Sequence, residues 1–467
     1  MLIYIKVNIN LFKVIKIYLY KYTKSFLRSK GSMKRLKIAF IHAVCAFLIF
    51  STVFMTGCGK NTDDNDGNTY VFATWAAGEE LKEFQEIIDR INNEANGDFY
   101  IKTLSIPSDY YIKISTYVAG KKTPDFFWLT QELISKYASM GVIADITDEF
   151  KASTEINPDT FYPGVLASAE YDCKYYGVPW IANPLIVYYN RDLFREAGVD
   201  FPDPLGGWTW DEFIDVASKL TVKKTDSNGN QYQQYGYIVD GWPNIETFIW
   251  AGGGDIVGEN GKDILIDSHE TLKGLGILQK ILKSGITPKY SEVASLGSNN
   301  VWFEKQRAAM FMGGIQDNFE EKISKLPEEE RFEIGYAPMP VCADGKPHGF
   351  DWTASTVMSK KLEGDKKAFM ILEKITKEFF KWKIAPPIKG TVEQIVEIDP
   401  LKEPALPTIK ICLENARSAN YTPEWNEIND KLWNRIYSKM LNDPDFDYET
   451  EAKAVAREAR EIMDKRK

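Results

Sequence analysis

Cys58 is the residue whose position most directly indicates chemistry, because it stands directly behind a glycine in the run Met-Thr-Gly-Cys at residues 55–58. Upstream, basic residues at positions 34, 35 and 37 precede an uncharged, mostly apolar stretch at residues 38–54. A basic segment, an apolar segment and small residues ahead of a cleavage point make up a secretory signal. The sequence therefore predicts export of the chain.

A cysteine directly behind such a small residue resembles the lipobox of bacterial lipoproteins. The resemblance implies that the signal is cut before Cys58, and that Cys58 becomes a new N-terminus carrying thioether-linked diacylglycerol. With N-acylation this gives the multi-chain anchoring that stable membrane attachment needs. We therefore expect the protein at the outer face of the bacterial cytoplasmic membrane, extracellular or periplasmic. Residues 58–68 are polar and are predicted to be a flexible tether.

An alternative interpretation is a plain transmembrane anchor, since residues 38–57 are about long enough to span a bilayer. A span does not require Thr-Gly-Cys at its outer edge, however, so the lipobox interpretation is favoured. Met33 already begins a complete signal peptide. Residues 1–32 are therefore interpreted as an extension ahead of the true start, and residues 1–57 as extension plus lipoprotein signal.

The charge of the chain separates a basic N-terminal segment from an acidic body. Residues 1–57 hold ten Lys or Arg and no Asp or Glu, so their removal moves the formal net charge from -9 to -19. Such a balance argues against nucleic acid and against an anionic membrane surface as partners. A body of about 400 residues is large enough for two lobes with separate cores.

Cysteines and histidines predict neither a disulfide scaffold nor a metal site. Three cysteines remain outside the signal and the lipid site, namely Cys173, Cys342 and Cys412. Three cannot all pair, so we expect a fold that stands without disulfides. The chain's three histidines show no metal-ligand spacing, and no dinucleotide or Walker-type glycine motif occurs. The sequence predicts no metal and no cofactor.

The order of elements predicts a parallel sheet with helices. A β-rich run at residues 70–75 precedes a helix over 79–91, whose apolar residues recur at helical spacing, and a strand at 99–103. Strand–helix–strand order is typical of parallel sheets. Another strand is expected at 125–129.

Later segments carry helix signals with defined ends. A helix at residues 191–197 is expected to stop at Gly198. A second helix begins with the capping box Thr209–Glu212. The tail at residues 425–463 is predicted to form two amphipathic helices, on which Trp425 and Trp433 have the spacing of core residues.

Several stretches, in this order, resemble the family 1 extracellular solute-binding proteins of ABC importers, the group that includes maltose-binding protein. They are Thr74-Trp75, Thr123-Pro124-Asp125-Phe126-Phe127, Gly177-Val178-Pro179-Trp180, residues 187–198, residues 208–213, residues 308–314, Tyr336-Ala337-Pro338-Met339-Pro340 and Ser359-Lys360. No single stretch is diagnostic. The resemblance rests on their order and spacing over nearly all of residues 69–467, behind a lipobox.

The resemblance implies a two-lobed α/β fold with the ligand cleft between lobes that two or three crossing segments join. The crossings are placed near residues 189–190, 308 and 358–359. Lobe 1 would then comprise residues 69–188 plus 309–358, and lobe 2 residues 189–308 plus 359–467. Such folds place ligand groups on loops at the carboxyl ends of strands.

Aromatic side chains are the first candidates for ligand contact, because rings pack on the CH-rich faces of sugars. Five tryptophans are placed at strand ends, on turns or beside a glycine-rich loop: Trp75, Trp128, Trp242, Trp250 and Trp352. The alternative for each is packing within its own lobe, and Trp242 and Trp352 are favoured most. Trp208 and Trp210, which flank the capping box, are interpreted as structural.

Polar candidates are side chains that pair with hydroxyl groups. Asp351 adjoins Trp352, and Asn183 lies in the loop that leads into a crossing strand. Glu79 is the third candidate, although a charge in the first turn of a helix is itself favourable. Several stacking platforms together suggest a ligand of more than one sugar ring.

The resemblance implies a monomeric, lipid-anchored receptor that captures a carbohydrate and delivers it to the permease subunits of an ABC transporter by lobe closure. No catalytic residue is predicted. One alternative keeps the fold but makes the protein the ligand-presenting partner of a membrane sensor. The other is a secreted glycoside-active enzyme, which would need a pair of carboxylates; no such pair stands out in a local motif.

Overall fold

The computed structural model describes residues 68–467 apart from residues 227, 317–318, 384–385 and 466–467. The predicted signal and Cys58 lie outside the described residues, as does the tether up to residue 67. Within the described part, no helix is both long enough and apolar enough to cross a membrane.

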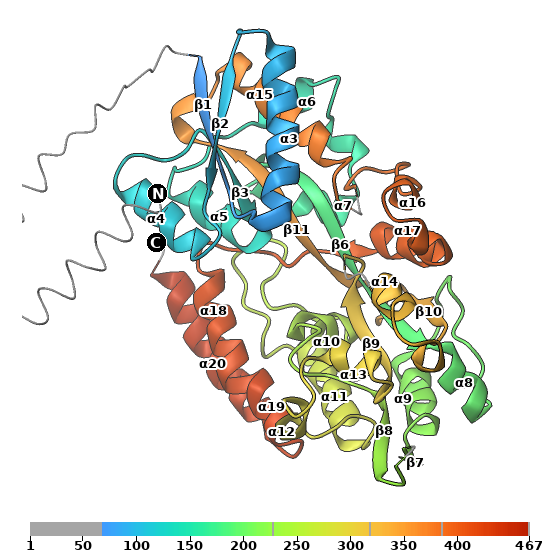
Figure 1. Ribbon diagram of the computed structural model, residues 1–467. Helices are drawn as coiled ribbons and strands as arrows, with labels where there is room; N and C mark the ends of the chain where they lie inside the picture. The colour runs from blue at the N-terminus through green and yellow to red at the C-terminus, as the bar shows by residue number, and fades with distance from the viewer. Residues whose placement is uncertain (1–67, 227, 317–318, 384–385, 466–467) are drawn as a thin grey trace, which may run out of the picture. The chain divides into compact units, whose positions relative to one another are not determined.

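One mixed sheet of ten strands runs through this part of the chain (Figure 1). Its main path has the order β2-β1-β3-β11-β6-β9-β8-β7, with β10 beside β6 and β12 beside β11. The strands are β1 (Thr69–Thr74), β2 (Tyr100–Ser105), β3 (Phe126–Thr130), β6 (Val178–Asn190), β7 (Val222–Thr225), β8 (Gln231–Tyr237), β9 (Ala308–Gly314), β10 (Ile334–Ala337), β11 (Gly349–Met358) and β12 (Ala416–Arg417). A separate hairpin pairs β4 (Glu170–Tyr171) with β5 (Lys174–Tyr175).

The long strand β6 connects the two ends of the sheet (Figure 1). Its residues 178–184 pair with β11, which in turn pairs with β3, whereas residues 185–189 pair with β9. The change of partner falls between Pro184 and Leu185. The strands β1–β3 therefore lie on one side of this strand pair and β7–β9 on the other.

Helices cover both ends of the sheet (Figure 1). The α-helices are α3 (Gly78–Ala95), α4 (Tyr110–Ala119), α5 (Gln131–Ser139), α6 (Thr147–Ala152), α7 (Pro163–Ala167), α8 (Arg191–Ala197), α9 (Trp210–Lys219), α10 (Ile245–Ala251), α11 (His269–Lys283), α12 (Tyr290–Val293), α13 (Asn299–Glu304), α14 (Phe319–Ser324), α15 (Lys366–Phe379), α16 (Gln394–Ile398), α17 (Leu406–Glu414), α18 (Trp425–Leu432), α19 (Ser438–Asn442) and α20 (Tyr448–Asp464). Short 3-10 turns are η1 (Pro158–Thr160), η2 (Glu328–Glu330), η3 (Lys360–Leu362) and η4 (Pro400–Ala405), and η5 (Trp433–Tyr437) is a π-helical turn.

Predicted elements in the first half of the chain are confirmed. β1 and β2 pair in parallel on either side of α3 in the chain, and β1 also pairs in parallel with β3. α8 ends at Gly198, whose φ of 64° lies in the left-handed region that glycine adopts without strain. The capping box of α9 is present, with Thr209 and Glu212 bonding each other's backbone N–H groups.

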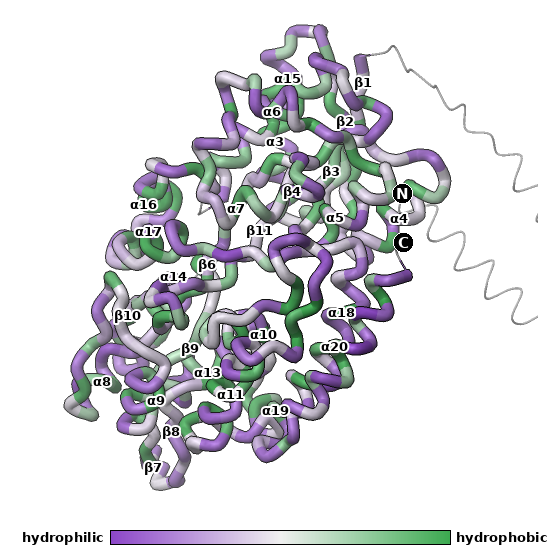
Figure 2. Tube along the Cα trace, turned by 180° about the vertical axis from the view of Figure 1, so that it is seen from behind, coloured by the Kyte–Doolittle hydropathy of each residue, from purple (hydrophilic) through white to green (hydrophobic). Residues whose placement is uncertain are grey.

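Separate apolar clusters form under the two ends of the sheet. One contains Phe72, Phe84 and Phe126 with β1–β3, α3 and α15, and another contains Phe213, Tyr237 and Phe248 with β8, α9 and α10. Hydrophobic and hydrophilic residues alternate along α20 in Figure 2, and its buried side chains include Val455 and Ala459. The fold is thus α/β, as predicted.

Three free cysteines occur among the described residues. Cys342 and Cys412 are buried, and burial raises the pKa of each thiol to about 12. Cys173 is exposed in the turn of the β4–β5 hairpin.

Candidate ligand-binding site

A pocket of about 380 Å³ lies where the two ends of the sheet approach each other. Gln131 and Glu132 begin α5 directly after β3, and Gly241 to Glu246 form the loop from β8 into the start of α10. Phe350 reaches the pocket from β11, and the remaining lining residues belong to the segment at residues 421–437. The pocket therefore sits beyond the carboxyl ends of β3 and β8, where α/β sheets place ligands.

Aromatic rings form much of the pocket wall. The rings that line it are Phe350, Tyr421, Trp425, Trp433 and Tyr437. Tyr421 and Trp425 meet edge to face at 4.7 Å between ring centroids, and Trp433 and Tyr437 do so at 5.5 Å. Trp433 is 38% exposed, so part of its side chain is open to solvent.

Trp433 and Tyr437 are the end residues of the π-helical turn η5, a feature that frequently marks functional sites. Gly241 packs directly against the ring of Trp433: a Cβ atom at Gly241 would lie 2.6 Å from Cη2 of that ring. Gly241 also has a φ of 101°, which side chains rarely adopt. Both facts restrict position 241 to glycine and hold the ring in place.

The polar side of the pocket is fixed by Gln131, which is buried. Its Oε1 accepts from the backbone N–H of Thr353 at 2.7 Å and from the Thr353 hydroxyl at 2.8 Å. Its Nε2 donates to the Tyr421 hydroxyl at 2.7 Å. Gln131 thereby ties the end of β3, the strand β11 and the C-terminal segment together at the pocket wall.

Two carboxyl groups removed from solvent to different degrees line the same pocket: Glu246 is buried and Glu132 is half-buried. Burial raises the pKa of Glu132, and a hydrogen bond from the Thr130 hydroxyl opposes part of that rise. Burial raises the pKa of Glu246 to about 7, opposed by hydrogen bonds that include one from Asn244 Nδ2 at 2.8 Å. Burial and the charges of both carboxylates raise the pKa of Tyr421 well above its usual value. The negative charges of both carboxyl groups therefore disfavour ionisation of the Tyr421 hydroxyl.

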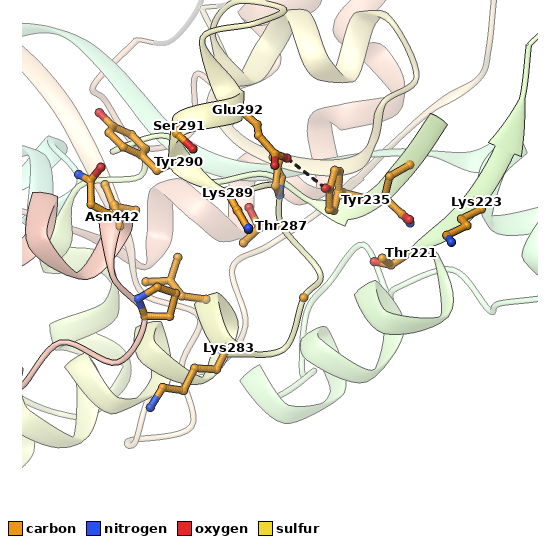
Figure 3. Close-up of a pocket in the computed structure, with 16 residues that line it drawn as sticks. Thr221, Lys223, Tyr235, Lys283, Thr287, Lys289, Tyr290, Ser291, Glu292 and Asn442 are labelled. Atoms are coloured by element: carbon orange, nitrogen blue, oxygen red, sulfur yellow. Dashed lines mark hydrogen bonds between the residues drawn. The ribbon is translucent and has the colours of Figure 1, made fainter. Parts of the chain in front are cut away.

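A second hollow of about 830 Å³ lies away from β1–β3, between β7, β8, α11, α12 and α19 (Figure 3). Lys223, Lys283 and Lys289 line it, and the Tyr235 hydroxyl bonds the Glu292 carboxylate at 3.4 Å. All its lining residues come from one end of the sheet. The 380 Å³ pocket, by contrast, draws on both ends of the sheet, and it is the candidate site.

The eight ligand residues predicted from the sequence are not among those that line this pocket. Two of them, Trp75 and Trp128, lie together in an aromatic cluster under β1–β3, with ring centroids 4.7 Å apart. Trp128 is fully buried and also stacks on Trp180 at 4.7 Å. Glu79 is exposed and pairs with Lys82 at 3.0 Å.

Asp351, Asn183 and Trp352 lie together where β6 changes partner. The fully buried Asp351 accepts from the backbone N–H of Asn183 through Oδ1 at 2.7 Å, and its Oδ2 has no hydrogen-bond partner among the described residues. Burial raises the pKa of Asp351 to about 8, which the Asn183 bond partly opposes. Asn183 also accepts from the backbone of Gln316 at 3.1 Å, and Trp352 is half-buried.

Trp242 and Trp250 both pack against Phe350, which itself lines the pocket. Trp242 is half-buried and meets Phe350 edge to face at 5.8 Å between centroids, whereas Trp250 is fully buried with its ring 6.5 Å away. The Arg417 guanidinium lies 4.9 Å from the centroid of Trp250. These tryptophans thus form the layer behind the pocket wall, and a direct role for any of the eight residues stays a prediction.

Sequence reasoning passed over the residues that line the pocket. Trp433 was interpreted as a core residue from its spacing, and this is wrong, because the buried positions of its helix are Trp425, Ile428 and Leu432 and the ring of Trp433 points off that stripe. Gln131 could have been found, since it lies two residues beyond the strand predicted at 125–129, near its carboxyl end, and directly follows β3 in the structure.

The family model for bacterial extracellular solute-binding proteins matches residues 76–386. The chain belongs to this family. The resemblance read from the sequence, to family 1 solute-binding proteins of ABC importers, is thereby confirmed. The family is one of binding proteins, and no group of three metal-ligating side chains occurs among the described residues of this solute-binding protein.

Relatives and solved structures agree with this assignment. The solute-binding protein is 24% identical over 302 residues to the diacetylchitobiose-binding protein DasA of Streptomyces coelicolor, covering 62% of this chain and 63% of DasA. It is 24% identical over 283 residues to the sn-glycerol-3-phosphate-binding periplasmic protein UgpB of Escherichia coli K12, covering 58% of this chain and 60% of UgpB.

The fold is similar to that of the ABC substrate-binding protein Lmo0181 of Listeria monocytogenes, solved in complex with cycloalternan. The TM-score is 0.66 at 21% identity, over 85% of this chain and 98% of Lmo0181. The predicted two-lobed fold class of the solute-binding protein is therefore confirmed.

Proposed function

We propose that this protein captures a carbohydrate outside the cell and delivers it to the permease subunits of an ABC transporter. The observation that carries the proposal is the pocket between the two ends of the sheet, which combines five aromatic rings with amide and carboxyl side chains. Rings suit the CH faces of sugars, and amides and carboxyls suit their hydroxyl groups. DasA, a relative, is named for binding diacetylchitobiose.

A phosphorylated solute is the main rival ligand, since UgpB is named for binding sn-glycerol 3-phosphate. Phosphate recognition relies on Arg, Lys or clustered backbone N–H groups. Among the described residues that line the pocket there is no Lys, Arg or His, whereas Glu132, Glu246 and Asp430 bring carboxylates. This composition favours an uncharged or cationic ligand over an anionic one.

The first test is titration of residues 59–467 with neutral mono- and oligosaccharides and with their phosphorylated counterparts. Tryptophan fluorescence reports binding, because Trp425 and Trp433 line the pocket. Thermal unfolding reports it independently, since a ligand that binds only the native state raises the apparent stability. A saturable change with a neutral sugar supports the proposal, and a response to phosphorylated compounds alone contradicts it.

The mechanism we propose is closure of two lobes, with the boundaries expected from the sequence: residues 69–188 plus 309–358, and 189–308 plus 359–467. Ligand that touches both walls binds the closed form more tightly and so shifts the population toward it. The pocket is lined by residues of α5 and β11 as well as by residues of α10 and α18, which suits this mechanism. The protein is proposed to act as a monomer.

Lipid attachment at Cys58 is also proposed, as the means of holding the receptor at the membrane. Its support is the lipobox-like run at residues 55–58 behind a signal-like segment. Cells that express the full chain and receive labelled palmitate should yield a labelled membrane-bound protein. Cys58→Ser should remove the label and release the protein, while Cys173→Ser serves as the matched control and should leave both unchanged.

A further inference from the structure

The charges around the pocket carry information about the charge of its ligand. Three lining residues, Glu132, Glu246 and Asp430, are acidic, and none of the described lining residues is basic. Glu246 is only 5% exposed. When these carboxyl groups are ionised, no lining residue supplies a counter-charge. Taking a carboxylate out of water without a cation nearby is costly.

Hydrogen bonds from neutral groups reach two of these carboxyl groups but bring no positive charge. Thr130 donates to Oε1 of Glu132, and Asn244 donates to Oε2 of Glu246. Both donors are neutral groups. Asp255 lies close enough to add a further negative charge, which raises the pKa of Glu246 along with its burial.

Basic side chains near the pocket are already paired with other carboxylates. Arg417 bonds Asp255 at 2.8 Å and lies over the ring of Trp250. Lys431 and Arg435, which belong to the helical segment that lines the pocket, pair with Glu458, and Arg435 also pairs with Glu451 of α20. Their charges are therefore already paired with carboxylates that do not line the pocket.

We propose that the pocket selects sugars that carry a protonated amine, such as 2-amino-2-deoxy sugars and their oligomers, over the matching neutral sugars. This inference rests on the proposed carbohydrate-binding function. An ammonium group supplies the missing counter-charge and donates charge-assisted hydrogen bonds to Glu246 and Glu132, while the aromatic wall packs against the ring face. An acetamide or hydroxyl group at the same carbon supplies no charge.

The test compares sugars that differ only at carbon 2. Titration calorimetry of residues 59–467 is run with glucose, glucosamine and N-acetylglucosamine, with the galactose series, and with the β-1,4 dimers of glucose, glucosamine and N-acetylglucosamine. We expect the amine to bind at least about tenfold more tightly than its neutral partners in any series that binds. Below about pH 7 its binding should release protons, seen as a heat that depends on the buffer, because an ammonium lowers the pKa of the carboxyl groups it contacts.

Two variants test whether the charge of Glu246 causes the amine preference. Glu246→Gln keeps the size of the side chain and an acceptor oxygen for Asn244 but removes the charge, and it should remove most of the amine preference and the proton release. Glu427→Gln, an exposed position on the same helix as Asp430, should leave both unchanged. If Glu246→Gln does not fold, Asp430→Asn at the exposed edge of the pocket should reduce the preference instead.

The outcomes separate this inference from the function on which it rests. Neutral sugars that bind as tightly as their amines, or more tightly, overturn the amine preference and leave carbohydrate binding intact. An amine preference that survives both Glu246→Gln and Asp430→Asn also overturns it. Failure of every sugar, neutral or amine, contradicts carbohydrate binding itself, and the inference fails with it.

Discussion

Buried carboxyl groups are the most informative single residues of this molecule. Asp351 sits without exposure at the point where β6 changes partner, and only one of its oxygens is bonded among the described residues. Glu246 is buried and Glu132 half-buried at the pocket wall instead, and burial raises the pKa of both. In both places the loss of water around the carboxyl group raises its pKa, at the strand crossing in one case and at the pocket in the other.

Asp351 makes stability depend on pH. Its pKa of about 8 in the folded protein lies above the value of an exposed aspartate, so the unfolded chain holds fewer protons than the native state between about pH 4 and 8. This contribution to stability is complete below about pH 4 and is lost as the pH rises to about 8, by at most about 1.4 kcal/mol per pH unit.

Asp351→Asn should remove that pH dependence, so the variant gains stability relative to the wild type from pH 5 to pH 8. Urea unfolding at several pH values measures the difference. Asp200→Asn, an exposed position, is the matched control and should follow the wild type. A constant difference between Asp351→Asn and the wild type across this range would contradict the assignment.

Trp433 is expected to contribute mainly to binding. Trp433→Ala should weaken the affinity for the bound sugar by about tenfold or more, while thermal stability changes little because the ring is 38% exposed. Trp382→Ala is the control: this half-buried ring packs in the cluster of Trp128 and Trp180, so its loss should lower stability and spare affinity. Equal affinity losses in both variants would argue against a stacking role.

Elements of the chain's second half are held together by a buried ion pair. Lys402 of η4 bonds Glu320 of α14 at 2.7 Å, and Glu320 also accepts from the hydroxyl of Tyr336 on β10 at 2.9 Å. Removing one partner of such a pair leaves a charge buried without compensation. Three elements that are distant in the sequence therefore depend on this contact.

Lys402→Met should lower the free energy of unfolding by about 3 kcal/mol, because Glu320 loses its counter-charge. Urea unfolding measures the loss. The double variant Lys402→Met with Glu320→Gln removes both charges, keeps an acceptor for Tyr336, and should recover a substantial part of that loss. A double variant as unstable as the sum of its single variants would show that the pair is not coupled.

At the scale of single helices and strands, much of the architecture could be predicted from the sequence. The helical spacing of α3, the Gly198 stop and the Thr209–Glu212 capping box are local signals, and all three are confirmed. The pocket wall could not be predicted in this way, because Gln131, Glu246 and Trp433 are brought together by contacts between segments far apart in the chain. Nor does local spacing reveal the π-helical turn that begins at Trp433.

The whole molecule consists of two groups of strands joined through β6 and β11. Because β6 pairs with β11 up to Pro184 and with β9 from Leu185, a rotation of one group against the other concentrates its backbone change near that junction. Pocket residues lie on both sides of the junction. Ligand binding and rotation are therefore expected to be coupled.

Small-angle scattering should show this coupling as a decrease in the radius of gyration of residues 59–467 when a bound sugar saturates the protein. The compaction follows from contacts that exist only when both walls touch the ligand. A sugar that does not shift the melting temperature is the control and should leave the scattering curve unchanged. Binding without any compaction would contradict lobe closure and leave the binding site itself in place.

The three described cysteines give the molecule a practical property. Cys173 is exposed on the β4–β5 hairpin, whereas Cys342 and Cys412 are buried and their thiols resist ionisation. A maleimide dye added to the folded receptor without its lipid cysteine should therefore react at one position. The same thiol would attach every molecule to a sensor surface in one orientation, so that an array could record the capture of solutes by this receptor as an optical or electrical signal.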